Sequence, residues 1–228
     1  MGRFHAKVLR DLGYEVVTVD PNPVAGADYA TTRDIPGGLT RFDAAAVATP
    51  PGALVPTAYH LAGIRKVLVE KPYAYSSEVA VLITKHMRDA GSDVCVGLTE
   101  RFNPQARALK RRAVTGARTV KFTRWNDRPS FDVDLDLKLH DVDLALWLGV
   151  NSVAEFDTRA DSRERVRAIE VTKFDGTTQR VDLMAHDLSP LHALWHAFLT
   201  DGEYPTPEDV IHAHRFLDLL RDKEEVAA

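Results

Sequence analysis

The fold is decided by residues 67–72, Val-Leu-Val-Glu-Lys-Pro. The first half is an apolar, β-branched run typical of a buried strand, and Pro72 cannot extend a strand because proline has no backbone N–H. The run therefore predicts a strand that delivers Lys71 to its carboxyl end. In an open parallel sheet, ligands bind in the crevice outside the carboxyl ends of the strands. Lys71 is accordingly a candidate functional residue, and a solvated lysine after a strand is the alternative.

Strands and helices alternate around this stretch, up to residue 99. Apolar spacing and the positions of Gly and Pro predict helices at 1–12, 53–62 and 78–90, and strands at 14–20, 43–48, 66–70 and 93–98. Repeated strand–helix units of this length predict a parallel sheet with helices on both faces.

The first helix and strand match the second half of a dinucleotide-binding fingerprint. Gly2 would be its third glycine, and Asp20, 18 residues later, would hold the ribose hydroxyls. The helix N-terminus would face the pyrophosphate. The first two glycines and the strand before them are not in this sequence, and a helix followed by a strand is common, so this remnant alone is weak support.

The pattern changes after Gly97. We predict helices at 104–114, 134–148, 189–200 and 207–222, and strands at 118–126, 152–159, 165–174 and 178–185. Asp175-Gly176 is a hairpin signal between the last two strands. The expected fold is α/β: a Rossmann-like parallel sheet lacking its first strand in a domain of residues 1–99, then a reduced α+β domain of residues 100–228 with an open, mainly antiparallel sheet.

Composition excludes several classes of protein. The chain of 228 residues has a net charge of -4, which argues against a nucleic-acid or membrane surface. No apolar run is long enough to cross a bilayer. Cys95 is the only cysteine, which excludes an internal disulfide and fits a reducing compartment. We expect a cytoplasmic protein in which Cys95 lies in a buried strand.

A second informative stretch is the predicted helix at 134–148. Asp136, His140 and Asp143 are spaced four and three residues apart, so they are expected on one helical face. An Asp one turn before a His orients the imidazole and raises its basicity, which suits proton transfer. An ordinary polar helix face is the first alternative. A metal site with these three ligands is another, although it offers a single nitrogen ligand.

Four motifs together resemble a known family in their order and spacing. They are Ala48-Thr49-Pro50, Glu70-Lys71-Pro72, Glu100-Arg101-Phe102-Asn103-Pro104, and Asp136-x-x-x-His140-x-x-Asp143. The family is that of glucose-fructose oxidoreductase, inositol dehydrogenase and MocA (Gfo/Idh/MocA). The third and fourth motifs look most like the branch that contains sugar-nucleotide 3-dehydrogenases. The resemblance covers nearly the whole chain.

The resemblance implies an NAD-dependent oxidoreductase that acts on a secondary hydroxyl of a sugar, cyclitol or sugar nucleotide. Lys71 would polarise the hydroxyl, His140 would be the general acid/base, and Asp136 would assist. The dinucleotide would contact Gly2, Arg3, Phe4, Asp20, Thr49, Pro50, Glu70 and Lys71. Substrate contacts are implied for Arg101, Asn103 and Asp143.

The resemblance also implies partners and a cofactor. NAD is preferred over NADP, because Asp20 would repel a 2′-phosphate and no basic residue follows it until Arg33. We expect no metal, a small-molecule substrate, and a homo-oligomer formed through the open sheet of the second domain.

The chain departs from the family at its start, where the first strand and the glycine-rich turn are missing. Either the true start lies upstream, or the protein is a reduced descendant. The second case favours another function, a non-catalytic ligand-binding or assembly module. A metal-dependent lyase or isomerase that uses Asp136, His140 and Asp143 is a third possibility.

Overall fold

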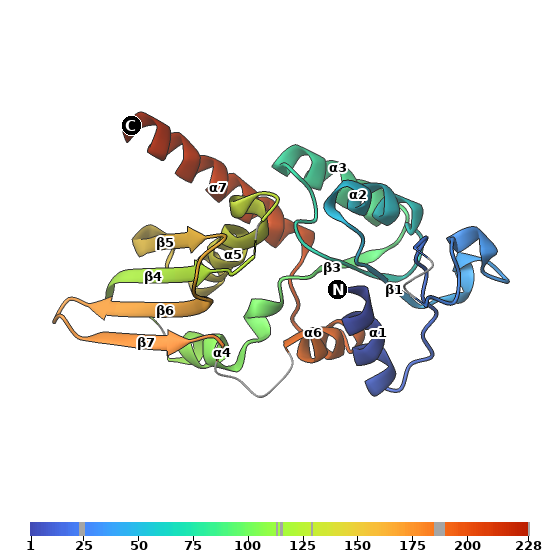
Figure 1. Cartoon of the computed structure of the whole chain (residues 1–228), viewed down its shortest axis with the longest axis horizontal. Helices are drawn as coiled ribbons and strands as arrows, with labels where there is room; N and C mark the ends of the chain where they lie inside the picture. Colours follow the sequence, from blue (N-terminus) through green and yellow to red (C-terminus); the bar gives the residue numbers. More distant parts are fainter. Residues whose placement is uncertain (23–25, 113, 115, 129, 185–189, 228) are drawn as a thin grey trace. The chain divides into compact units, whose positions relative to one another are not determined.

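The computed structural model describes residues 1–22, 26–112, 114, 116–128, 130–184 and 190–227 (Figure 1). It contains two compact units. The first unit comprises Met1–Ala74, Glu78–Gly97 and Leu191–Pro207, and the second comprises Tyr75–Ser77, Leu98–Pro190 and Glu208–Ala228. Leu191–Pro207 therefore packs in the first unit, whereas the sequence interpretation assigns it to the second domain.

The first unit is built on a three-stranded parallel sheet of order β1-β2-β3. The strands are β1 (Ala44–Val47), β2 (Lys66–Val69) and β3 (Asp93–Val96). All residues of the central strand β2 are buried, and Cys95 in β3 is fully buried, as expected. Because the strands are parallel and in register, the residues that follow them lie at one edge of the sheet.

Helices cover both faces of this sheet, as the alternating pattern predicts. The helices are α1 (Gly2–Asp11), α2 (Pro51–His60), α3 (Ser77–Asp89) and α6 (Pro190–Leu199). Figure 1 shows α2 and α3 on one side of the sheet and α1 and α6 on the other. The buried Lys66 anchors the α6 region to β2, because its Nζ donates to Phe198 O at 2.7 Å and pairs with Asp201.

The expectation of a strand at 14–20 is wrong. Residues in this stretch form one parallel bridge, between Val19 and Tyr29, with a backbone hydrogen bond on each side of Tyr29. A strand needs a ladder of bonds along a neighbour. In the described residues the neighbour is a short segment, held also by the Asp28 carboxylate, which accepts from Thr18 N at 2.7 Å. Two short 3₁₀ turns, Thr32–Asp34 and Leu39–Arg41, complete this region.

The second unit contains a four-stranded sheet of order β5-β4-β6-β7. The strands are β4 (Ala117–Trp125), β5 (Ala154–Arg159), β6 (Val166–Lys173) and β7 (Thr178–Asp182). β5 runs parallel to β4, and the other two pairs are antiparallel, so the expected mainly antiparallel sheet is confirmed. The hairpin at Asp175-Gly176 is also confirmed, with Gly176 at φ 84°.

The second unit also contains helical segments. They are the 3₁₀ turns Thr99–Phe102 and Asn151–Val153 and the helices α4 (Pro104–Arg111), α5 (Leu139–Leu148) and α7 (Pro207–Ala227). The helix expected at 134–148 is divided, because Asp134–Lys138 is a π-helical turn. Gly149 ends α5 at φ 76°, as predicted. Residues 113, 185 and 189, at the ends of three expected elements, lie outside the described residues.

The described helices carry no membrane-spanning segment, because none is both long and apolar enough to cross a bilayer.

Replacing Phe122 by Ala tests the core of the second unit. Phe122 is fully buried in a cluster with Leu144 and Ile169 and stacks on Phe156 at 5.5 Å. We expect Phe122→Ala to lower the free energy of unfolding of this unit by about 3–5 kcal/mol, the cost of a large core cavity. Urea denaturation measures it. The matched control is Phe174→Ala, 79% exposed, which should change stability by less than about 0.5 kcal/mol. Equal effects would show that the assigned core is wrong.

Candidate functional site

The carboxyl end of β2 holds a buried carboxylate next to the candidate lysine. Glu70 is 6% exposed, and its Oε1 lies 2.9 Å from His5 Nε2. Its Oε2 accepts the backbone N–H of Lys71 at 3.3 Å. Lys71 itself is half-buried, and its peptide bond to Pro72 is cis. The Glu-Lys pair thus lies where the strand pattern predicts, at the ligand-binding edge of a parallel sheet.

Gly97 makes space for this carboxylate, which sequence reasoning missed. A Cβ on Gly97 would meet Glu70 Oε2 at 2.9 Å and the Glu70 Cα at 3.2 Å. Such contacts are too close for any side chain. The only sequence signal is a glycine directly after the buried strand that ends at Val96.

Three of the residues expected to hold the dinucleotide lie at the start of α1, next to the carboxyl end of β1. Gly2, Arg3 and Phe4 form the exposed first turn of α1, and a Cβ on Gly2 would lie 4.0 Å from the Ala48 Cβ after β1. Met1 offers no side-chain cap to this helix. The first N–H groups of a helix lack intrahelical acceptors and favour an anion. The start of α1 and the end of β1 are therefore neighbours.

Thr49 and Asp20 present groups suited to a polar ligand. The Thr49 hydroxyl is buried without a hydrogen-bond partner in the described part of the chain. A buried polar group is normally satisfied, so this hydroxyl fits a site completed by a bound group. Pro50 follows it and caps α2. Asp20 is exposed, and its Oδ1 accepts the Asn22 N–H at 2.8 Å.

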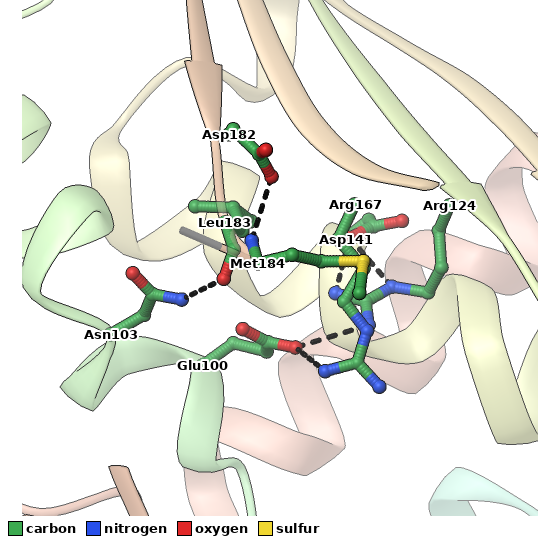
Figure 2. Close-up of polar contacts among 8 residues, drawn as sticks. All are labelled: Glu100, Asn103, Arg124, Asp141, Arg167, Asp182, Leu183 and Met184. Carbon is green, nitrogen blue, oxygen red and sulfur yellow. Dashed lines mark hydrogen bonds and ion pairs between the residues drawn. The ribbon is translucent and has the colours of Figure 1, made fainter. Parts of the chain in front are cut away.

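The second unit contains a buried network of carboxylates and guanidinium groups (Figure 2). Arg124 is 2% exposed, and its Nε and Nη2 donate to Asp141 Oδ1 at 3.0 and 2.9 Å. Its Nη1 donates to Glu100 Oε1 at 3.1 Å, and Arg167 Nη1 donates to the same oxygen at 3.1 Å. Two positive charges therefore balance two negative charges, the condition under which buried charges are tolerated.

Burial dominates the electrostatics of this network. It raises the pKa of Asp141, and Arg124 opposes this effect without cancelling it. Burial alone would lower the pKa of Arg124, but Asp141 and Glu100 raise it above the ordinary value. The pKa of Arg167 is lowered by burial, against the attraction of Glu100. The network thus keeps both arginines beside carboxylates, and Asp141 Oδ2 has no partner among the described residues.

The expected substrate contacts are engaged inside the second unit. Arg101 binds Asp143 with Nε at 2.9 Å and Nη2 at 2.5 Å, and Nη2 also lies 3.0 Å from Asp209. Asn103 is fully buried, donates to Leu183 O and accepts from Gln105 N as the cap of α4. These contacts shape the unit, and the substrate roles of Arg101, Asn103 and Asp143 stay predictions.

Asp136 and His140 differ from Asp143. The first two are half-buried, whereas Asp143 is 1% exposed and held by Arg101. Asp136 lies in the π-helical turn, a feature frequent at functional sites, and its Oδ2 accepts from Ser130 Oγ at 2.9 Å. In the residues that the structure describes, no group of three His, Cys, Asp or Glu side chains is arranged to hold a metal ion. Asp143 is therefore bound by Arg101 and is not arranged as the third ligand of a metal centre with Asp136 and His140.

No protein-family model and no curated protein matches this chain, but solved structures do. One is UDP-N-acetylglucosamine 3-dehydrogenase GnnA from Acidithiobacillus ferrooxidans, with a TM-score of 0.77 and 17% identity, covering 96% of this chain and 92% of that chain. Another is the WlbA (WbpB) dehydrogenase from Thermus thermophilus in complex with NAD and UDP-GlcNAcA, with a TM-score of 0.74 and 21% identity, covering 95% of this chain and 90% of that chain. A third is the dehydrogenase MviM from Clostridium difficile, with a TM-score of 0.76 and 15% identity, covering 95% of this chain and 93% of that chain. At these identities the likeness is one of fold.

Removing Arg124 tests whether the buried network depends on charge balance. Arg124→Met leaves Asp141 buried without its partner, so we expect a loss of about 3–5 kcal/mol in the free energy of unfolding at neutral pH. The double variant Arg124→Met/Asp141→Leu keeps the pair of Glu100 and Arg167 and should lose clearly less. Urea denaturation compares them, and equal losses would contradict the charge explanation.

The same variant has a signed pH dependence. Without Arg124, nothing as close opposes the effect of burial, so the pKa of Asp141 rises further in the folded state. A raised carboxyl pKa favours folding below the unfolded value of about 3.9, and this contribution is lost as pH rises through the folded pKa. The deficit of Arg124→Met should therefore shrink on acidification, and a deficit that grows at low pH would overturn this assignment.

Proposed function

Because the chain has the fold of Gfo/Idh/MocA-type dehydrogenases, we propose that it is an NAD-dependent oxidoreductase. Its substrate is a secondary hydroxyl of a sugar, cyclitol or sugar nucleotide. The observation that carries the proposal is Glu70-Lys71 at the carboxyl edge of a parallel sheet, in a fold shared with a dehydrogenase whose structures hold NAD. Parallel sheets bind ligands at that edge.

The residues of the first unit fit a dinucleotide. The N-terminus of α1 offers backbone N–H groups to a pyrophosphate, and the carboxylate of Asp20 suits ribose hydroxyls. The Thr49 hydroxyl, which has no hydrogen-bond partner among the residues that the structure describes, suits the nicotinamide side, beside Pro50. Bound NAD⁺ would accept the hydride from the carbinol carbon.

The proposed proton chemistry uses Lys71, His140 and Asp136. Lys71 donates a hydrogen bond to the reacting hydroxyl and stabilises the negative charge that grows on its oxygen. His140 takes the hydroxyl proton while the C–H hydride leaves, and returns a proton in the reverse direction. Asp136 orients the imidazole from the turn before it. The sugar nucleotide is the favoured substrate class, because two of the similar structures are named for, or hold, UDP-linked sugars.

We further propose that the chain forms a homo-oligomer through the face of the β5-β4-β6-β7 sheet that carries Lys121 and Arg180. Both side chains are about half exposed, and each is paired with an acidic residue of a neighbouring strand. Light scattering on the purified chain tests this.

NADH binding to the purified chain tests the cofactor assignment, by fluorescence or calorimetry. We expect Asp20→Ala to weaken binding about tenfold or more, because hydrogen bonds to a charged group contribute about 1.5–3 kcal/mol. The exposed Asp127 provides the matched control, and Asp127→Ala should bind as the parent chain does. A folded chain that binds no NADH would overturn the oxidoreductase and favour a non-catalytic module.

Substitution of Lys71 and His140 tests the chemistry. With a UDP-linked N-acetylhexosamine as substrate, we expect Lys71→Met and His140→Asn to lower kcat by about 10²–10⁴-fold, the usual contribution of general acid–base catalysis. In His140→Asn the NADH affinity should stay close to that of the parent chain. His196→Asn changes an exposed histidine and is the control. Unchanged kcat in His140→Asn would remove His140 from the mechanism.

A further inference from the structure

A chain of buried hydrogen bonds leads from α6 to Lys71 within the first unit. Trp195 Nε1 lies 3.0 Å from His5 Nδ1, and His5 Nε2 lies 2.9 Å from Glu70 Oε1. Glu70 Oε2 then accepts the backbone N–H of Lys71. Trp195 is fully buried, and His5 is 1% exposed. Neither His5 nor Trp195 is part of the four sequence motifs or of the expected catalytic and binding residues.

The indole ring of Trp195 fixes the direction of both hydrogen bonds of the His5 ring. An indole N–H only donates, so His5 Nδ1 must accept and carries no proton. The single ring proton of a neutral imidazole is then on Nε2, where it donates to the Glu70 carboxylate. The edge-on approach of the two rings, at 87°, agrees with this arrangement. The other tautomer would set two donors against each other and leave Glu70 Oε1 without its donor.

Glu70 is held from two further sides. Gly97 leaves no room for a side chain beyond Oε2, and the Lys71 N–H approaches the same oxygen. Each oxygen of the Glu70 carboxylate therefore accepts a hydrogen bond, and the backbone of Gly97 packs against Oε2. A group held in this way fixes the backbone at the point where the strand ends.

We infer that His5 and Trp195 are positioning residues: Trp195 sets the His5 tautomer, His5 orients Glu70, and Glu70 fixes the backbone N–H of Lys71. Neither residue touches the reacting atoms. The inference rests on the proposed function for the role of Lys71, but its hydrogen bonds can be measured without substrate or cofactor.

Three variants separate hydrogen bonding from packing. Trp195→Phe keeps an aromatic ring and removes the donor to His5. His5→Leu fills the same space with an apolar side chain and removes both bonds. His5→Gln retains an amide that can accept from Trp195 and donate to Glu70, so it is the conservative variant. A positioning role predicts rescue by His5→Gln, whereas packing alone does not distinguish it from His5→Leu.

Nitrogen-15 NMR of the full chain tests the tautomer. The His5 ring signals are those missing from His5→Gln, and the exposed His212 is an internal reference. We expect His5 to carry its proton on Nε2 in the parent chain and to lose this strict preference in Trp195→Phe. A proton on Nδ1 in the parent chain, or an unchanged preference in Trp195→Phe, would overturn the inference.

Amide hydrogen exchange at Lys71 tests the positioning. We expect about tenfold faster exchange at this amide in Trp195→Phe and His5→Leu, since local opening is easier there, and near-parent exchange in His5→Gln. Equal exchange in all four proteins would overturn the inference, and if His5→Leu fails to fold, Trp195→Phe against His5→Gln decides. Failure of the proposed function appears separately, as absent NADH binding with this hydrogen-bond pattern intact.

Discussion

The fully buried guanidinium of Arg124 determines how the second unit is assembled. One side chain from β4 binds Asp141 of α5 and Glu100 of the turn after β3. A buried charge without partners is far more costly than any single hydrophobic contact gains, so these three elements have one acceptable arrangement. His140, the candidate base, is the residue before Asp141. Its position on α5 is thus set by an ion pair in which it has no part.

The first unit repeats this arrangement with other residues. Lys71 follows Glu70 directly, and Glu70 is held by His5, which lies 65 residues earlier in the sequence. In both units a buried carboxylate adjoins the candidate reactive residue, and a distant part of the chain supplies its donor. Lys71 and His140 stay half-buried, while the neighbouring buried carboxylates of Glu70 and Asp141 are held in place by hydrogen bonds. Preorganisation of this kind is what catalysis by positioned groups requires.

The sequence predicts what local patterns determine. The run that ends at Pro72 and the glycine at position 149 each place the end of an element correctly. The parallel sheet follows from the alternation of strands and helices, and the dehydrogenase fold follows from the order of the motifs. It does not predict the bonds of Trp195 to His5, which join residues 190 apart, because such pairings have no periodicity. The strand expected at 14–20 fails because a ladder depends on its neighbour. The π-helical turn is missed because the spacing argument assumes a uniform α-helix.

The return of residues 191–207 to the first unit affects the order of events during synthesis. Synthesis proceeds from the N-terminus, so the helix that supplies Trp195 leaves the ribosome 190 residues after His5 of helix α1. The stretch Leu98–Pro190, which carries the whole four-stranded sheet, emerges before that. The first unit is therefore completed only after all strands of the second unit's sheet have been synthesised, and until then His5 lacks the indole donor that sets its tautomer.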